Sequence, residues 1–238
     1  IWEDKKMKSN YDVAIIGGGI GGIMAAYRLA EQAPGLHVCI LEKGHAIEKR
    51  ICPIVAKKTD KCIKCSSCAI MEGMAGAGAF SDGKYVISTE YGGWLTDFLP
   101  SETVIDYIEQ ADRILVSFGA TTERFLPDNE LKKRCLQHDL HMSQAQLKHL
   151  GTDANFETMR RLIHSLDGKV DIYTDTDVTA VDKEKHLLTA VNNKTEVQVK
   201  ADKIIFAVGR SGSRFFSAWC MENGIALDNN QVDVGVRV

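Results

Sequence analysis

Several features that would assign a chain directly to a functional class are missing here. No apolar run reaches the length of a membrane span, so we expect no membrane-spanning segment. The formal net charge is -3 and the two signs are mixed along the chain, which gives no reason to expect nucleic acid as a partner. There is no internal repeat, no low-complexity tract and no Ser/His/Asp or paired-carboxylate arrangement. Oligomeric state is left undetermined.

The cysteine distribution of a disulfide framework is also missing. The chain has seven cysteines, an odd number, and four of them cluster between Cys52 and Cys68. A disulfide framework would distribute its cysteines along the chain, so we expect a reducing, cytoplasmic location.

What the sequence does have is a strand–turn–helix–strand pattern near its start. The apolar run Tyr11–Ile16 has the length of a buried parallel strand, and the glycine loop Gly17–Gly22 follows at once. A helix is expected over Ile23–Ala30. A second apolar run, Leu36–Leu41, is followed directly by Glu42.

This spacing is typical of dinucleotide binding. Gly17 permits a tight turn, Gly19 leaves room for a diphosphate against the backbone, and Gly22 lets the helix pack close to the sheet. The helix N-terminus attracts the diphosphate. Glu42 stands where a carboxylate accepts hydrogen bonds from ribose hydroxyls.

The remainder predicts one large domain, residues 11–224, after a disordered tail, residues 1–10. It contains a cysteine-rich loop (44–72) and a helical insertion (99–150). Helices are expected at 101–118, 131–150 and 152–166, with caps at Ser101 and at Thr152 or Asp153, and strands at 170–174, 178–181, 187–191, 195–199 and 203–208. Residues 232–238 alternate between apolar and other residues and then stop, so we expect residues 225–238 to be the start of a truncated substrate domain.

A second glycine-rich loop covers residues 73–84. Small residues at this density indicate that something approaches the backbone closely, and we assign Gly78 to that contact. Ser81, Asp82 and Lys84 could face a cofactor ring, or they could only shape the loop.

The order of these parts is similar to that of flavoproteins of the glutathione reductase superfamily. The chain most closely resembles a bacterial family of uncharacterised FAD-dependent dehydrogenases. The motifs that carry this resemblance are Gly17–Gly22 with Glu42, Cys52-Pro53 with Cys62, Cys65 and Cys68, Gly76–Lys84, His149–Asp153, Gly209–Gly212 and Val234–Arg237.

The resemblance implies an α/β, Rossmann-like FAD/NAD(P)-binding domain with a small β meander, truncated at the C-terminus. It also implies FAD on Gly17, Gly19, Gly22 and Glu42. Val178 would meet the adenine through its backbone, and Gly209 would close over the dinucleotide. The substrate would be a small molecule.

The cysteine cluster predicts a metal site. Cys62, Cys65 and Cys68 are spaced to wrap one centre, with Cys52 as the fourth ligand of an iron–sulfur cluster. Zinc is an alternative, although its usual spacing is two separated pairs. Unligated or redox-labile thiols are the other reading.

Three functions compete. The leading one is an FAD-dependent oxidoreductase, with flavin carrying the chemistry and NAD(P)H as an optional co-substrate. The second is an NAD(P)-dependent dehydrogenase, which the meander disfavours. The third is a non-catalytic flavin or iron–sulfur redox sensor.

Overall fold

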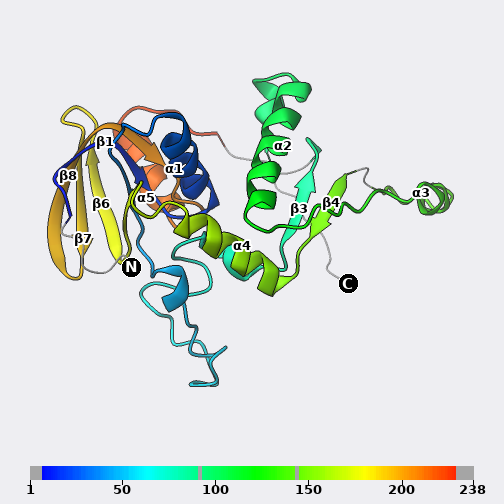
Figure 1. Cartoon of the computed structure of the whole chain (residues 1–238), viewed down its shortest axis with the longest axis horizontal. Helices are drawn as coiled ribbons and strands as arrows, with labels where there is room; N and C mark the ends of the chain where they lie inside the picture. The colour runs from blue at the N-terminus through cyan, green and yellow to red at the C-terminus, as the bar shows by residue number, and fades with distance from the viewer. Residues whose placement is uncertain (1–6, 91–92, 143–144, 229–238) are drawn as a thin grey trace.

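The computed structural model describes residues 7–90, 93–142 and 145–228. Its centre is a six-stranded sheet in the order β5-β2-β1-β8-β7-β6 (Figure 1). The strands of this sheet are β1 (Asn10–Ile16), β2 (Val38–Leu41), β5 (Asp171–Tyr173), β6 (Thr176–Asp182), β7 (Leu187–Asn192) and β8 (Thr195–Phe206). The first four in sheet order pair in parallel, and β8-β7-β6 is an antiparallel meander.

The central strand β1 is buried on both faces. Val13 and Ile15 enter one apolar cluster, whereas Ala14 and Ile16 enter another on the opposite face. This alternation follows from the two-residue period of a strand, and it explains why the sequence shows a continuous apolar run there.

Helices cover both faces of the sheet. α1 (Ile20–Gln32) and α4 (Thr152–His164) contribute to the cluster that contains Val13 and Ile15. α5 (Ser213–Glu222) packs its aromatic side chains on the other face, against Phe206. The predicted fold class, an α/β Rossmann-like domain with a β meander, is therefore confirmed.

The end of the meander differs from the sequence prediction. Separate strands were expected at 195–199 and 203–208, but β8 runs without a break through Thr195–Phe206. Its first half pairs with β7 and its second half pairs with β1. One strand therefore joins the meander to the parallel sheet, and the polar residues between the two apolar runs do not interrupt it.

The insertion over 99–150 was predicted to be helical and is only partly so. α2 (Ser101–Ser117) forms as expected, but the helix predicted at 131–150 was wrong. α3 covers only Asn129–Leu136, and residues Gln146–His149 are strand β4. β4 pairs with β3 (Lys84–Ile87), a strand that the sequence analysis missed.

The predicted helix caps were also displaced. Ser101 is the first residue of α2, and the cap position belongs to Pro100. α4 is preceded by Gly151 at the cap position, with a φ of 78°, so neither Thr152 nor Asp153 caps it. Glycine is suited to this position because the backbone is left-handed there.

The tail was predicted to be disordered through residue 10, but part of it is ordered. Asn10 begins β1, the Ser9 carbonyl accepts a hydrogen bond from the Lys200 N–H at 2.8 Å, and Lys8 pairs with Asp171. Residues 1–6, and the predicted start of a substrate domain beyond residue 228, lie outside the described residues.

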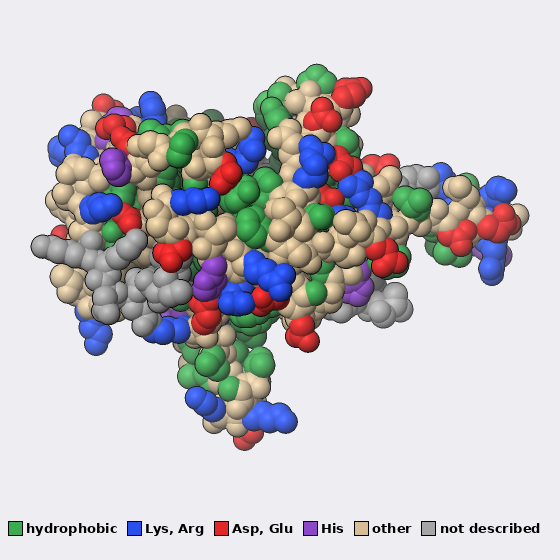
Figure 2. All heavy atoms as spheres, in the orientation of Figure 1, with side chains coloured by type: hydrophobic (Ala, Val, Ile, Leu, Met, Phe, Trp, Pro, Cys, Tyr) green, Lys and Arg blue, Asp and Glu red, His purple; other side chains and the backbone are tan. Residues whose placement is uncertain are grey.

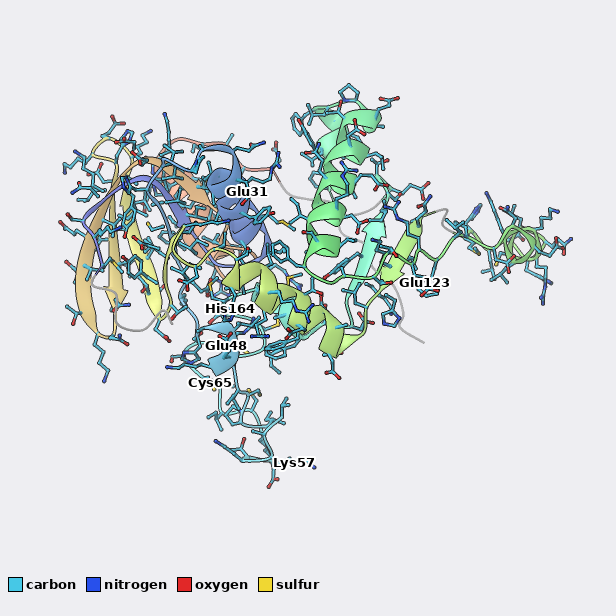
Figure 3. The ribbon with its side chains drawn as sticks, viewed as in Figure 1. Glu31, Glu48, Lys57, Cys65, Glu123 and His164 are labelled. Atoms are coloured by element: carbon cyan, nitrogen blue, oxygen red, sulfur yellow. The ribbon has the colours of Figure 1, made fainter. Side chains whose placement is uncertain are left out.

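Residues 51–68, which we call the cysteine arm, project from the body without helix or strand (Figure 1). Figure 2 shows apolar and Lys or Arg side chains on this projection. Its base follows the short 3₁₀ helix η1 (Ile47–Lys49), which is held to α4 by a 2.6 Å pair between Glu48 and His164 (Figure 3). Among the described helices, none is both long and apolar enough to cross a membrane.

Candidate functional site

Two glycines shape the turn that opens the site. Gly17 has a φ of 105°, and a Cβ added there would overlap the carbonyl oxygen of Ala207. Gly22, in the first turn of α1, lies so close to the Gly17 carbonyl that an added Cβ would overlap its oxygen. The steric reasons predicted for these glycines, a tight turn and close helix–sheet packing, are present in the structure.

Gly19 lies differently, at the edge of a cavity. It occupies the cap position of α1 with a φ of -70°, and a Cβ added there would meet no atom within 4 Å. The cavity has a volume of about 380 Å³ and is lined by residues 19–21, 71–73, 75–78 and 207–211, together with Glu42. It lies beyond the carboxyl ends of β1, β2 and β8, where ligands bind in open parallel sheets.

Glu42 links the two glycine loops at this cavity. Its side chain is buried. Oε2 accepts the Gly18 N–H at 2.6 Å, and Oε1 accepts the N–H groups of Gly44 and Gly73 at 2.8 and 2.9 Å. A carboxylate has about four acceptor positions, so about one remains on Oε2. The sequence indicated only a ribose contact, whereas the structure shows that Glu42 also organises the backbone around the cavity.

The second glycine-rich loop is fixed from both ends. The Ala75 N–H donates to the Gly18 carbonyl at 2.8 Å, which brings the two loops together. The 3₁₀ helix η2 (Gly76–Phe80) follows, and Asn155 of α4 donates from Nδ2 to the Gly78 carbonyl at 2.8 Å. Gly78 lines the cavity, and its predicted contact with a cofactor stays a prediction.

Arg50 was missed by sequence reasoning. Its buried guanidinium donates to four backbone carbonyls, at 2.7 to 3.0 Å, and lies 4.8 Å from the centre of the Phe80 ring. Burial lowers its pKa to about 10. The four carbonyls belong to Ala69, Ile70, Met74 and Gly76. Arg50 therefore ties the end of the cysteine arm to the cavity, and nothing in its sequence context separates it from the neighbouring basic residues.

The three residues proposed to face a cofactor ring lie outside the lining of the cavity. The Ser81 hydroxyl donates to the Gly78 carbonyl at 2.8 Å. Asp82 and Lys84 pair with each other at 2.9 Å near the surface, and this hydrogen bond lowers the pKa of the Asp82 carboxyl. These contacts favour the alternative in which the residues shape the loop, and a role toward a flavin stays a prediction.

Of the other two residues expected to contact a cofactor, one lines the cavity and one does not. Gly209 lines the cavity with a φ of 57°, immediately before Arg210 and Ser211, which also line it. Val178 is a buried residue of β6, paired with Ala190, and does not line the cavity. Its predicted backbone contact with adenine remains untested.

The four clustered cysteines are not gathered. Cys62, Cys65 and Cys68 are exposed, Cys52 is half-buried, and all four are free thiols. Within the described residues, no group of three or more His, Cys, Asp or Glu side chains is arranged to hold a metal ion. The expectation that the sulfurs would converge without a metal is therefore wrong, and the residues as placed do not fit a cluster or a zinc ion.

We predict that three thiols of the native protein react rapidly with a thiol reagent such as dithionitrobenzoate. These are Cys62, Cys65 and Cys68, because they are exposed. Cys39 and Cys220 should react only after unfolding, because both are buried, and burial raises the pKa of the Cys39 thiol. The measurement is the number of fast equivalents per chain.

A Cys65→Ser variant should have one fewer fast-reacting thiol per chain, with the reactivity of the other thiols unchanged. Protein purified without air should contain iron and zinc well below one ion per chain. Stoichiometric metal together with a missing fast phase would show that the thiols are ligands, and would overturn the free-thiol assignment.

Comparison with known proteins identifies the family of this chain. Residues 11–218 match the family model described as pyridine nucleotide-disulphide oxidoreductase. The chain belongs to this family. No curated protein matches the sequence significantly.

Among solved structures, this family member is similar to 3-ketosteroid-Δ4-(5α)-dehydrogenase from Rhodococcus jostii RHA1, with a TM-score of 0.51 and 15% identity over 86% of this chain and 47% of that chain. It is also similar to a variant of Escherichia coli quinol fumarate reductase, with a TM-score of 0.51 and 17% identity over 87% of this chain and 34% of that chain. At these identities the similarity concerns the fold. The chain spans about half, or less, of the length of these two relatives.

Proposed function

We propose that this family member binds FAD in the cavity and acts as an FAD-dependent oxidoreductase, moving hydride or electrons between the flavin and a small organic substrate. The observation that carries the proposal is the cavity itself, where the glycine loop, Glu42 and Gly209 meet beyond the ends of three parallel strands. A bound flavin would supply the redox chemistry, and the protein binds and orients it.

The residues of the cavity fit the parts of FAD. The N-terminus of α1 offers backbone N–H groups to the diphosphate, and Gly19 leaves the space open. The remaining acceptor position on Glu42 suits a ribose hydroxyl. Outside the cavity lining, Val178 would serve adenine through its backbone. A meander that returns to the parallel sheet favours FAD over a plain NAD(P) domain, which would continue with alternating strands and helices.

The finer assignments extend this proposal. The resemblance to bacterial FAD-dependent dehydrogenases supports a dehydrogenase reaction, with NAD(P)H as an optional co-substrate. The clustering of four cysteines supports a reducing, cytoplasmic location. A metal centre on the cysteine arm has no part in the proposal, because the described cysteines do not form one.

The test is a titration of the purified chain with FAD, followed by flavin fluorescence and by the visible absorption spectrum. Saturable quenching with a perturbed flavin doublet supports the proposal. Binding of NAD(H) or NADP(H) without any binding of FAD would favour the NAD(P)-dependent alternative. A flavin that binds but is reduced by no donor would favour the sensor.

Glu42→Gln is predicted to weaken FAD binding about tenfold or more, because charge-assisted hydrogen bonds contribute about 1–3 kcal/mol each. It should also lower the free energy of unfolding, since the amide NH2 would face at least one of the three backbone donors that the carboxylate now accepts. Isothermal titration and urea denaturation measure the two effects.

Glu31→Gln is the matched control. Glu31 lies on α1, is exposed and pairs with Lys169, so its loss should leave both quantities nearly unchanged (Figure 3). An unaltered FAD dissociation constant in Glu42→Gln would remove Glu42 from the binding site.

A further inference from the structure

Asn155 joins α4 to the wall of the cavity. Its side chain is buried, with Nδ2 2.8 Å from the carbonyl oxygen of Gly78 and Oδ1 2.6 Å from the hydroxyl of Tyr85 on β3. The loop wraps tightly around this amide, because a Cβ added at Gly83 would come within 2.9 Å of the Asn155 Cβ. A buried amide with a partner on each side is held in one orientation.

The chemistry of the two partners decides that orientation. A carbonyl oxygen can only accept, so the group that faces Gly78 is the NH2 of the amide. The amide oxygen then faces Tyr85, whose hydroxyl donates. Burial, with a smaller contribution from the charge of Asp112, raises the pKa of Tyr85 to about 12, so this hydroxyl keeps its proton at neutral pH.

The bond to Gly78 holds one peptide group of the cavity wall toward α4. A trans peptide is planar, with its C=O and N–H pointing in opposite directions. Since Asn155 holds the Gly78 carbonyl toward α4, the N–H of Ala79 points away from α4. Gly78 lines the cavity, so the position of this peptide shapes the wall that a bound molecule would contact.

Other contacts hold the same segment against α4. The Gly151 N–H donates to the Asp82 carbonyl at 2.9 Å, and the Leu150 N–H donates to the Gly83 carbonyl at 3.0 Å. Phe80 packs on Phe156, with ring centroids 5.7 Å apart. The Gly78 carbonyl also accepts hydrogen bonds from the Ser81 hydroxyl at 2.8 Å and from the Ser81 N–H at 3.1 Å, both within the loop. Asn155 is therefore the donor that ties this carbonyl to α4.

We propose that Asn155 is a positioning residue for the bound flavin: through the Gly78 carbonyl it fixes the orientation of the Gly78–Ala79 peptide in the cavity wall, and Tyr85 holds its amide in place. The inference rests on the proposed function, since FAD is the ligand that would contact this part of the cavity wall. Asn155 itself does not line the cavity.

The test compares three variants by FAD titration and visible spectrum. Asn155→Leu removes both hydrogen bonds and should raise the FAD dissociation constant about three- to tenfold, the effect of one neutral hydrogen bond. It should also shift the flavin absorption maxima. Tyr85→Phe keeps the ring and removes only the hydroxyl, so it should give the same spectral shift with a smaller loss of affinity, and it serves if Asn155→Leu does not fold.

Asn155→Asp separates positioning from a merely structural role. Its carboxylate cannot donate to the Gly78 carbonyl, but the protonated acid can. FAD affinity and the spectrum should therefore return toward those of the unaltered chain as the pH falls through the pKa of that carboxyl, which burial raises. Asn155→Leu should show no such recovery.

Asn223→Leu is the control, because Asn223 makes a comparable bond, Nδ2 to the Trp219 carbonyl at 2.8 Å, away from the cavity. It should leave the flavin spectrum unchanged. If the unaltered chain binds FAD and the Asn155 variants bind it with the same affinity, spectrum and pH dependence, the inference is overturned and the proposed function stands. If the unaltered chain binds no FAD, both fall.

Discussion

Gly22→Ala is expected to lower the free energy of unfolding by about 3 kcal/mol or more. The added Cβ would overlap the carbonyl oxygen of Gly17 and would also come within 3.3 Å of the Ile15 side chain. Ile15 belongs to β1 and Gly17 follows directly after its end, so α1 would have to move off β1 to relieve both contacts. Overpacking in a well-packed interior costs about 1–3 kcal/mol, and a backbone obstacle places the cost at the upper end.

Urea denaturation of Gly22→Ala and Gly21→Ala measures this directly. Gly21 is the preceding residue of the same helix turn, and a Cβ added there would meet no atom within 4 Å. Because alanine favours a helix over glycine by about 1 kcal/mol, Gly21→Ala should be as stable as the unaltered chain, or slightly more so. Equal stability of the two variants would contradict close packing between α1 and β1.

The strand–turn–helix–strand unit near the start of the chain was predictable because its sequence pattern is local. The run Tyr11–Ile16, the glycine spacing and Glu42 each have a short-range pattern with one good structural solution, and β1, α1 and β2 form where they were expected. The long strand β8 was not predictable in one piece, because its polar middle residues look like a turn until β1 is known to pair alongside them.

The helical prediction for the insertion over residues 99–150 failed for a related reason. Residues 131–150 are rich in helix-forming side chains, yet among the residues described there the helix ends at Leu136. Strand β4 exists because β3 pairs with it, and strand pairing between distant segments leaves little trace in either sequence alone. The buried Lys148 illustrates this, because its place is set by a 2.7 Å pair with Asp112 of α2.

In the candidate site, sequence reasoning found the glycines and Glu42 but missed the residues that hold the loops. Arg50 and Asn155 act on backbone carbonyls, and any donor of suitable length could do so from many sequence positions. The cysteine spacing is a different case. It indicated a ligand set, but spacing cannot tell whether an arm without secondary structure folds back on itself, and here the described thiols stay apart.

Gly19→Val is expected to weaken FAD binding about 10- to 100-fold while leaving the stability of the chain nearly unchanged. Gly19 has ordinary backbone angles, and a Cβ there would meet no protein atom within 4 Å, so valine is accommodated by the fold. The same side chain would occupy the cavity at the N-terminus of α1, where the diphosphate is proposed to lie. The loss of binding free energy from this steric overlap should equal that of an overpacked contact, about 1–3 kcal/mol.

FAD titration and urea denaturation on the same preparation separate this effect from that of Gly22→Ala, in which the fold itself is damaged. Gly35→Val is the matched control for the side chain added, since Gly35 also has open space around its Cβ position and lies outside this cavity. It should bind FAD as the unaltered chain does. If Gly19→Val retained full affinity for FAD, the diphosphate could not lie against the glycine loop, and the cofactor would have to be placed elsewhere in the chain.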